Sequence, residues 1–206
     1  MPALAYHSIF GFYGFWLPND PRGSGSDYVA SLVLLKFGKA TKVHSRRSVA
    51  GNAHDHAQRL AAKQALKYAR LKITGSQALA VANGFKQAIS ETGYALYACA
   101  IMPDHVHLVI QRHVRSIRQI IGHLKARATS AIRSETRLQG GRPIWGAHGW
   151  NIFLTSDEDV RRAIRYVQAN PTKDNRPRQH WSFVREFTGV HAIPFHPLRF
   201  ALKSGD

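Results

Sequence analysis

The chain has 206 residues, of which 44% are hydrophobic, so it can form one compact domain with an appended segment. Its formal net charge of +17 predicts a polyanionic partner. Nucleic acid is the preferred candidate, and an anionic membrane surface is the weaker one. The single cysteine, Cys99, excludes a disulfide framework or a zinc site made of several thiolates, and its apolar surroundings predict a small core residue. The sequence has neither a signal-peptide pattern nor an apolar run long enough to cross a membrane, which predicts a cytoplasmic protein without membrane contact.

The first part of the chain combines one aromatic strand with a basic insertion. Residues 5–17 alternate loosely and are rich in aromatic side chains, which predicts a strand that ends in the turn-forming residues 18–23. Residues 36–72 are rich in Lys, Arg, His and Ala. We expect them to form an irregular basic insertion with one helix near 57–69.

The middle of the chain has regular periodicity. Apolar spacing predicts a helix over residues 76–92, followed by a hairpin of strands 94–102 and 105–112. Ser116 and Gln119 have capping-box spacing, and the apolar stripe after them predicts a long helix that begins there.

The last part should contain one more strand, one helix and a tail. A short strand is expected over residues 150–154. Thr155 and Glu158 have the spacing of a second capping box, for a helix that Pro171 should stop. Residues 172–206 are predicted to form a basic tail of little regularity.

This order of elements predicts an α+β fold in a single domain, residues 1–206. The core would be ferredoxin-like, a split β-α-β arrangement with an antiparallel sheet. The basic insertion would follow the first strand, and a C-terminal helix bearing a tyrosine would precede the tail. This fold supports many functions, so the function must be argued from the site.

Two histidines in the second strand of the hairpin are candidate metal ligands. His105 and His107 are two residues apart in a strand, so their side chains should point to the same face. Two such imidazoles and a third ligand can bind a divalent cation, although ordinary polar strand residues show the same spacing. His54 and His56 also have this spacing, but in a region expected to be helical or loose, where residues two apart diverge; we predict that this pair is solvated.

The last predicted helix carries a candidate nucleophile. Tyr166 and Asn170 are four residues apart and should share one side of the helix, beside its apolar stripe. A tyrosine at the edge of a core is usually a packing residue. Near paired histidines in a very basic protein, we interpret Tyr166 as a nucleophile that attacks a phosphodiester. A phenol is a weak nucleophile at neutral pH, so it needs a polarised phosphate, which Mg²⁺ or Mn²⁺ on His105, His107 and the amide oxygen of Asn170 would provide.

Three segments in the same order resemble one known family. Residues 99–109 contain Met-Pro-Asp-His-Val-His-Leu, residues 166–171 read Tyr-Val-Gln-Ala-Asn-Pro, and residues 15–23 read Phe-Trp-Leu-Pro-Asn-Asp-Pro-Arg-Gly. Together they resemble the single-tyrosine transposases named HUH for their His-hydrophobic-His strand. The nearest branches are the REP-associated tyrosine transposases and their IS200-like relatives.

The resemblance implies a bacterial enzyme that acts at the nucleoid, as a homodimer or a monomer. Such enzymes bind hairpin and single-stranded DNA, and they cleave and rejoin the single strand beside the hairpin. Tyr166 would form a 5′-phosphotyrosine and release a free 3′-OH. His105, His107 and the residue one turn after the tyrosine would bind the divalent metal; that residue is often Gln elsewhere in the superfamily and is Asn170 in this chain.

Basic side chains on two helices are predicted to contact the DNA: Lys125, Arg127, Arg133, Arg161, Arg162 and Arg165. The long helix and the insertion would provide separate basic surfaces for a duplex stem and its single-stranded flank. Two other functions fit the composition. One is a non-catalytic ferredoxin-like nucleic-acid-binding protein that stacks bases on sheet aromatics. The other is a metal-dependent nuclease in which water attacks and Tyr166 only packs.

Overall fold

The computed structural model describes residues 2–15, 17–20, 29, 32–39, 53–136, 138 and 141–189. Its four strands are β1 (Ala5–Phe12), β2 (Leu96–Ile101), β3 (His105–Gln111) and β4 (Trp145–Leu154). Its helices in the described part are α1 (Leu32–Leu35), α2 (His56–Gln64), α3 (Gly75–Thr92), α4 (Ile117–Glu135) and α5 (Asp157–Lys173).

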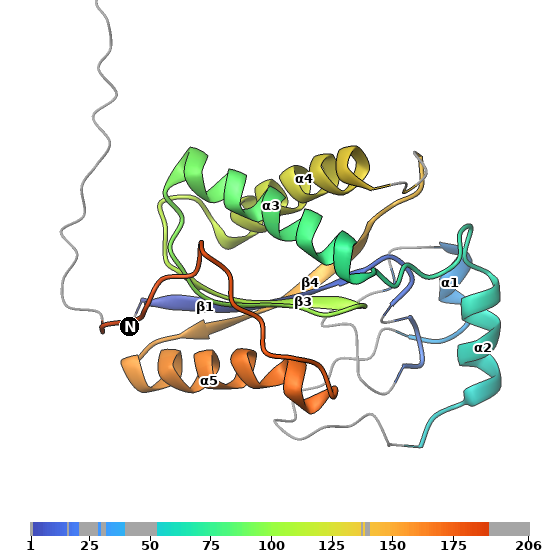
Figure 1. Cartoon of the computed structure of the whole chain (residues 1–206). Coiled ribbons are helices and arrows are strands. Elements are labelled where there is room, and N and C mark those ends of the chain that lie inside the picture. The colour runs from blue at the N-terminus through green and yellow to red at the C-terminus, as the bar shows by residue number, and fades with distance from the viewer. Residues whose placement is uncertain are drawn as a thin grey trace, which may run out of the picture.

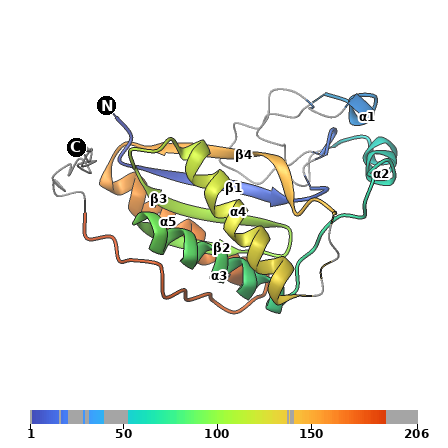
Figure 2. The same ribbon diagram turned by 90° about the horizontal axis from the view of Figure 1, so that it is seen from above.

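The four strands form one sheet in the order β2-β3-β1-β4, and every neighbouring pair is antiparallel. Strand β3 lies between β1 and β2, which are joined through α3, so the core is the predicted split β-α-β arrangement. Helices α3 and α4 cover one face of the sheet, and α5 covers the other (Figure 1; Figure 2). The predicted α+β, ferredoxin-like fold is therefore confirmed.

The alternation of side chains along the strands produces two hydrophobic cores. The larger core lies between the sheet and the α3–α4 layer, and it receives Val106, Leu108 and Ile110 from β3. The smaller core lies under α5, where Val109 packs with residues of β2 and of the helix. His105 and His107 have the same parity as Val109, so they share the face that α5 covers.

Helices α3 and α4 pack closely because Gly84 has no side chain. A Cβ built on Gly84 would lie only 2.5 Å from the backbone nitrogen of Ala128. Both helices begin with a complete capping box, Thr74 with Gln77 in α3 and the predicted pair Ser116 with Gln119 in α4.

Several predicted element boundaries were wrong. Strand β1 ends at Phe12, and β4 begins at Trp145 because it pairs with Phe12 beyond a register shift in β1. Helix α5 is capped by Ser156, whose hydroxyl accepts from the amide of Asp159, and not by Thr155.

Pro171 does not stop α5, which continues to Lys173. A proline in the last turn removes only one backbone hydrogen bond, and Pro171 is buried there. The helix ends before Asn175, whose φ of 52° is left-handed.

The segment after α5 is more ordered than predicted, up to residue 189. The side chain of Gln179 hydrogen-bonds both the amide and the carbonyl of Ile101, each at 2.8 Å. Val184 forms an isolated parallel bridge with Leu96. These contacts occupy the free edge of β2, where an unpaired strand would otherwise be exposed. Residues 190–206 lie outside the described part.

Much of the predicted insertion, residues 40–52, also lies outside the described part. Helix α2 is shorter than expected and begins with Asp55 as its N-cap. Because Asp55 is a cap, His54 and His56 are not both helical, and their rings lie 4.1 Å apart, so the prediction that this pair diverges was wrong. The prediction for Cys99 was right, since its thiol is free and buried. Within the described residues, no helix is long and apolar enough to span a membrane.

Candidate active site

The β2–β3 hairpin holds the two candidate metal ligands in place. Its turn is fixed from both sides: the carbonyl of Asp104 accepts from the amide of Phe12, and the carbonyl of Pro103 accepts from the amide of Ile73. His105 begins β3 directly after this turn, and His107 lies two residues further along the same face. Their Nε2 atoms are 2.9 Å apart, so the two imidazoles converge as the spacing predicted.

A third histidine joins this pair, and the sequence did not indicate it. His7 lies on β1, where it is paired with Val109 and therefore diagonal to His107 on the same face. Its Nε2 is 3.1 Å from Nδ1 of His107, and the two rings stack with their centroids 5.4 Å apart. Only the strand register, which a single sequence does not show, brings His7 to the site.

Burial favours the neutral form of two of the imidazoles, those of His7 and His107. It lowers the pKa of His7 to about 4. It also lowers the pKa of His107 well below its usual value, and the nearby His105, His7 and Lys173 act in the same direction. A neutral imidazole has a lone pair to offer a cation, which a protonated ring lacks.

Tyr166 lies beside the histidines, where α5 crosses the sheet. Small residues of β2, including Ala98 and Ala100, allow α5 to pack closely through Ala163 and Val167. The Tyr166 ring is on the flank of the helix, with its centroid 5.7 Å from that of His107 and 5.6 Å from that of His7. Tyr166 remains 45% exposed, so part of its side chain is open to solvent.

Two more side chains of α5 accompany Tyr166. The ammonium of Lys173, two helical turns later, lies 4.6 Å from the centre of the Tyr166 ring. Asn170 donates its amide N–H to the backbone carbonyl of Tyr166 at 2.8 Å. This hydrogen bond holds the Asn170 side chain against its own helix.

The two histidines provide part of the ligand set that a divalent cation needs. Two imidazole nitrogens 2.9 Å apart can both reach one ion at a bond length of about 2.1 Å. His105 also has an orienting partner, because its Nδ1 is 2.6 Å from a carboxylate oxygen of Asp104. The described residues contain no group of three or more His, Cys, Asp or Glu side chains that could hold a metal. Within the described part, the side-chain amide of Asn170 is the candidate for a further ligand, beside water or bound DNA.

The sequence model of the family "Transposase IS200 like" matches residues 64–170, which include both histidines and Tyr166. The chain belongs to this family. The match begins at the end of α2 and covers α3 through most of α5, so it contains most of the fold described above.

Two solved structures resemble the chain at low sequence identity. One is a REP-associated tyrosine transposase bound to a REP hairpin, with 12% identity, a TM-score of 0.47, and coverage of 84% of this chain and 70% of that one. The other is a candidate transposase from Deinococcus radiodurans R1, with 14% identity, a TM-score of 0.40, and coverage of 87% and 95% respectively. No curated protein matches the chain significantly.

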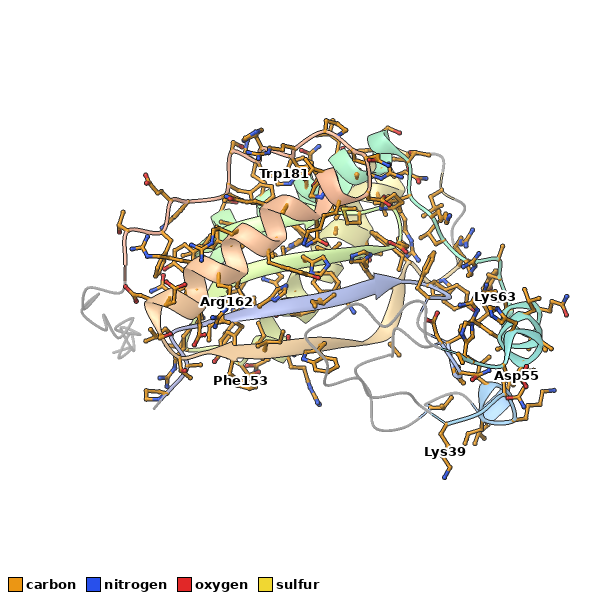
Figure 3. The ribbon with its side chains drawn as sticks, turned by 90° about the horizontal axis from the view of Figure 1, so that it is seen from below. Lys39, Asp55, Lys63, Phe153, Arg162 and Trp181 are labelled. Carbon is orange, nitrogen blue, oxygen red and sulfur yellow. The ribbon has the colours of Figure 1, made fainter. Side chains whose placement is uncertain are left out.

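The basic residues predicted to bind DNA lie on both sides of the sheet. On α5, Arg162 pairs with Asp159, and Arg165 lies 3.3 Å from Glu158 and is well exposed. Figure 3 shows α5, with Arg162, crossing the sheet between the segment with Trp181 and strand β4 with Phe153. Arg161 lies over the ring of Phe187, at 5.2 Å from its centre.

A pocket of about 410 Å³ opens between α5 and the segment that follows it. Arg161 and Arg165 line it, together with Arg185 and the aromatic rings of Tyr97 and Phe187. Arg161, Arg165 and Arg185 of this family member are therefore grouped next to aromatic surface, on the α5 side of the sheet.

The basic residues of α4 lie on the opposite side of the sheet from Tyr166. Arg127 pairs with Glu91 at 2.9 Å, and Arg133 donates to the carbonyl of Arg142. The Lys125 ammonium is turned inward: it donates to the carbonyl of Gly146 at 3.2 Å and lies over the rings of Phe10 and Trp145. The DNA-binding role of Lys125 stays a prediction, and this inward placement argues against it.

Proposed function

We propose that this family member cleaves and rejoins single-stranded DNA next to a hairpin, with Tyr166 as the nucleophile. The observation that carries the proposal is the convergence of Tyr166 with three histidine rings on the α5 side of the sheet. The Tyr166 ring lies within 6 Å of the rings of both His107 and His7, while His105 and His107 direct their Nε2 atoms toward each other. A role in packing alone does not explain why the Tyr166 side chain is partly exposed beside the converging imidazoles.

The covalent step is a transesterification. The phenolic oxygen of Tyr166 attacks the phosphorus, the bond from phosphorus to the 3′-oxygen breaks, and a 5′-phosphotyrosine and a free 3′-OH result. The phenol loses one proton and the departing 3′-oxygen gains one, so no redox partner or nucleotide cofactor is required. Because the phosphodiester energy is kept in the covalent intermediate, a 3′-OH can reverse the step and rejoin the strand.

His105 and His107 would hold a divalent cation, Mg²⁺ or Mn²⁺, and Asn170 is the proposed third ligand of the chain. When bound, such an ion supplies Lewis acidity at the scissile phosphate. Asn170 would have to turn its side chain from the carbonyl of Tyr166 to reach the ion. The chain's own residues orient the nucleophile: α5 fixes Tyr166 on its flank, and Lys173 places a positive charge over the phenol ring.

DNA would be bound mainly through electrostatic contacts between arginine side chains and phosphates. The exposed arginines of α5, Arg161, Arg162 and Arg165, are on the side of Tyr166 and suit the single strand, which stacks readily on aromatic surface. Arg127 and Arg133 on α4 lie on the opposite side of the sheet from Tyr166. They could contact the DNA only in a second region, such as a duplex stem. Such contacts to phosphates provide most of the affinity without base specificity.

A covalent-adduct experiment tests the proposal. The protein is mixed with a labelled hairpin that carries a single-stranded flank, in the presence of Mn²⁺, and is resolved on a denaturing protein gel. The wild type should form a labelled protein band, and Tyr166→Phe should form none while keeping its DNA affinity. Tyr97→Phe is the matched control, because it also removes one phenol oxygen, here one bonded to Gln111. It should leave the adduct intact.

The other outcomes are informative. Cleaved DNA without a protein band would indicate a nuclease that uses water, and a native-gel shift without cleavage would indicate a non-catalytic binder. His105→Ala and His107→Ala should abolish cleavage with little loss of DNA binding. Cleavage by Tyr166→Phe at a tenth of the wild-type rate or more would show that Tyr166 is not the nucleophile.

A further inference from the structure

The ring of His107 has two nitrogen contacts, and only one of them belongs to the proposed metal site. Its Nε2 faces Nε2 of His105 at 2.9 Å, and its Nδ1 faces Nε2 of His7 at 3.1 Å. If Nε2 gives its lone pair to a cation, the ring must carry its proton on Nδ1. That N–H then needs an acceptor, and His7 Nε2 is the atom placed to accept it.

His105 shows the same arrangement with a different partner. Its Nε2 faces Nε2 of His107, where the cation would bind, and its Nδ1 lies 2.6 Å from the carboxylate of Asp104. Histidines that bind metals almost always donate their other ring N–H to an acceptor, which fixes the tautomer and the ring orientation. Asp104 is next to His105 in the sequence, whereas His7 is one hundred residues from His107 and reaches it through the β1–β3 register.

His7 is held rigidly, as an orienting residue has to be. Its side chain is only 5% exposed and lies on a central strand of the sheet. Its ring stacks on that of His107 with an angle of 27° between the planes, and it meets the Tyr166 ring edge-on, with the centroids 5.6 Å apart. One residue of β1 therefore contacts both a candidate ligand and the candidate nucleophile.

We propose that His7 is a positioning residue, which accepts the Nδ1–H of His107 and so holds His107 in the tautomer and orientation that bind the divalent cation. The inference rests on the metal site of the proposed function and adds a residue to it. It concerns the affinity of the chain for the ion, so it can be tested without DNA and without turnover.

Two substitutions separate hydrogen bonding from packing. His7→Phe keeps a ring against His107 and Tyr166 but removes the acceptor, whereas His7→Gln can place its Oε1 near the position of the lost Nε2. We expect His7→Phe to weaken Mn²⁺ binding, measured by calorimetry on the DNA-free chain, by about 10- to 100-fold. His7→Gln should stay within a few-fold of the wild type.

Ser8→Ala is the matched control on β1. The Ser8 side chain points to the other face of the strand and bonds Asn151, so its loss perturbs β1 without touching His107. It should leave Mn²⁺ affinity unchanged. Asp104→Leu, which removes the acceptor of the His105 Nδ1–H, should weaken binding through His105 in the same way as His7→Phe does through His107.

A measurement on the wild type does not depend on the variants folding. Nitrogen-15 spectra of histidine side chains in the Mg²⁺-saturated chain should show His107 protonated at Nδ1 and His7 unprotonated at Nε2. His107 protonated at Nε2 would overturn the proposal, as would equal Mn²⁺ affinities of His7→Phe and the wild type. Equal weakening by Phe and Gln would also overturn it, because packing would then be the cause. Failure of the wild type to bind Mn²⁺ at all would instead remove the metal from the proposed function.

Discussion

Lys125→Met should make the protein more stable at neutral pH. The Lys125 ammonium lies in the layer between α4 and the sheet, and burial lowers its pKa from 10.5 to about 8. A lowered lysine pKa means that the folded state binds the proton less tightly than the unfolded state does. At neutral pH the folded chain therefore carries a charge that would be better solvated in the unfolded chain.

The size of this effect follows from the two pKa values. The difference between 10.5 and about 8 corresponds to a destabilisation of about 3 kcal/mol at pH 7. Met has a similar length and no charge, but it leaves the carbonyl of Gly146 without its donor, a loss of about 1 kcal/mol or more. We therefore expect a net gain of about 1–2 kcal/mol in the free energy of unfolding.

The pH dependence provides the stricter test. Between pH 8 and 10.5 the unfolded state holds the Lys125 proton and the folded state has lost it, so the wild type gains stability as the pH rises. From about pH 7 to about pH 9.5 this gain should be roughly 2 kcal/mol. Denaturant unfolding of both proteins at the two pH values isolates the contribution, since titration of other groups cancels in the difference.

Lys86→Met is the matched control, because Lys86 is an exposed lysine of α3. It should change neither the stability nor its pH dependence. If the gap between Lys125→Met and the wild type is the same at both pH values, the reasoning about the buried ammonium is refuted. DNA binding by Lys125→Met should be close to that of the wild type, because the ammonium is directed at its own chain.

Three further predictions concern packing, catalysis and DNA binding. Gly84→Ala should lower the free energy of unfolding by about 1–3 kcal/mol, because its Cβ would meet the backbone of α4; an unchanged denaturant midpoint would contradict this. Lys173→Met should slow adduct formation roughly tenfold by removing the charge over Tyr166, whereas Lys173→Arg should retain most of the rate. The log–log salt dependence of single-strand binding should be steep, and Arg161→Ala with Arg165→Ala should reduce its slope by roughly 1.4; an unchanged slope would place the DNA elsewhere.

The sequence by itself determined those features that depend on a local pattern of residues. The alternation in β3 predicted that His105 and His107 share a face, because a strand has a period of two wherever it pairs. The capping box at Ser116 fixed the start of α4, and the helical repeat placed Tyr166 at the edge of the apolar stripe of α5. The order of elements was enough for the ferredoxin-like core, since few connections of this kind are possible.

The element boundaries that were predicted wrongly depend on contacts between segments that are distant in the sequence. Strand β4 is longer than its own residues suggested because β1 offers a pairing partner back to Trp145. Helix α5 continues past the buried Pro171, where the proline removes only one hydrogen bond of the last turn. The segment around Gln179 is ordered because the edge of β2 needs hydrogen-bond partners.

Dependence on distant contacts also explains which features of the candidate site the sequence did not predict. His7 reaches His107 only through the register between β1 and β3, and Lys125 turns inward only because α4 packs over Phe10 and Trp145. Register and packing depend on residues one hundred positions apart, so no local pattern records them. Local periodicity thus placed the candidate histidines on one face of β3 and the candidate tyrosine on the flank of α5, and tertiary structure decided which other side chains accompany them and which basic residues face away.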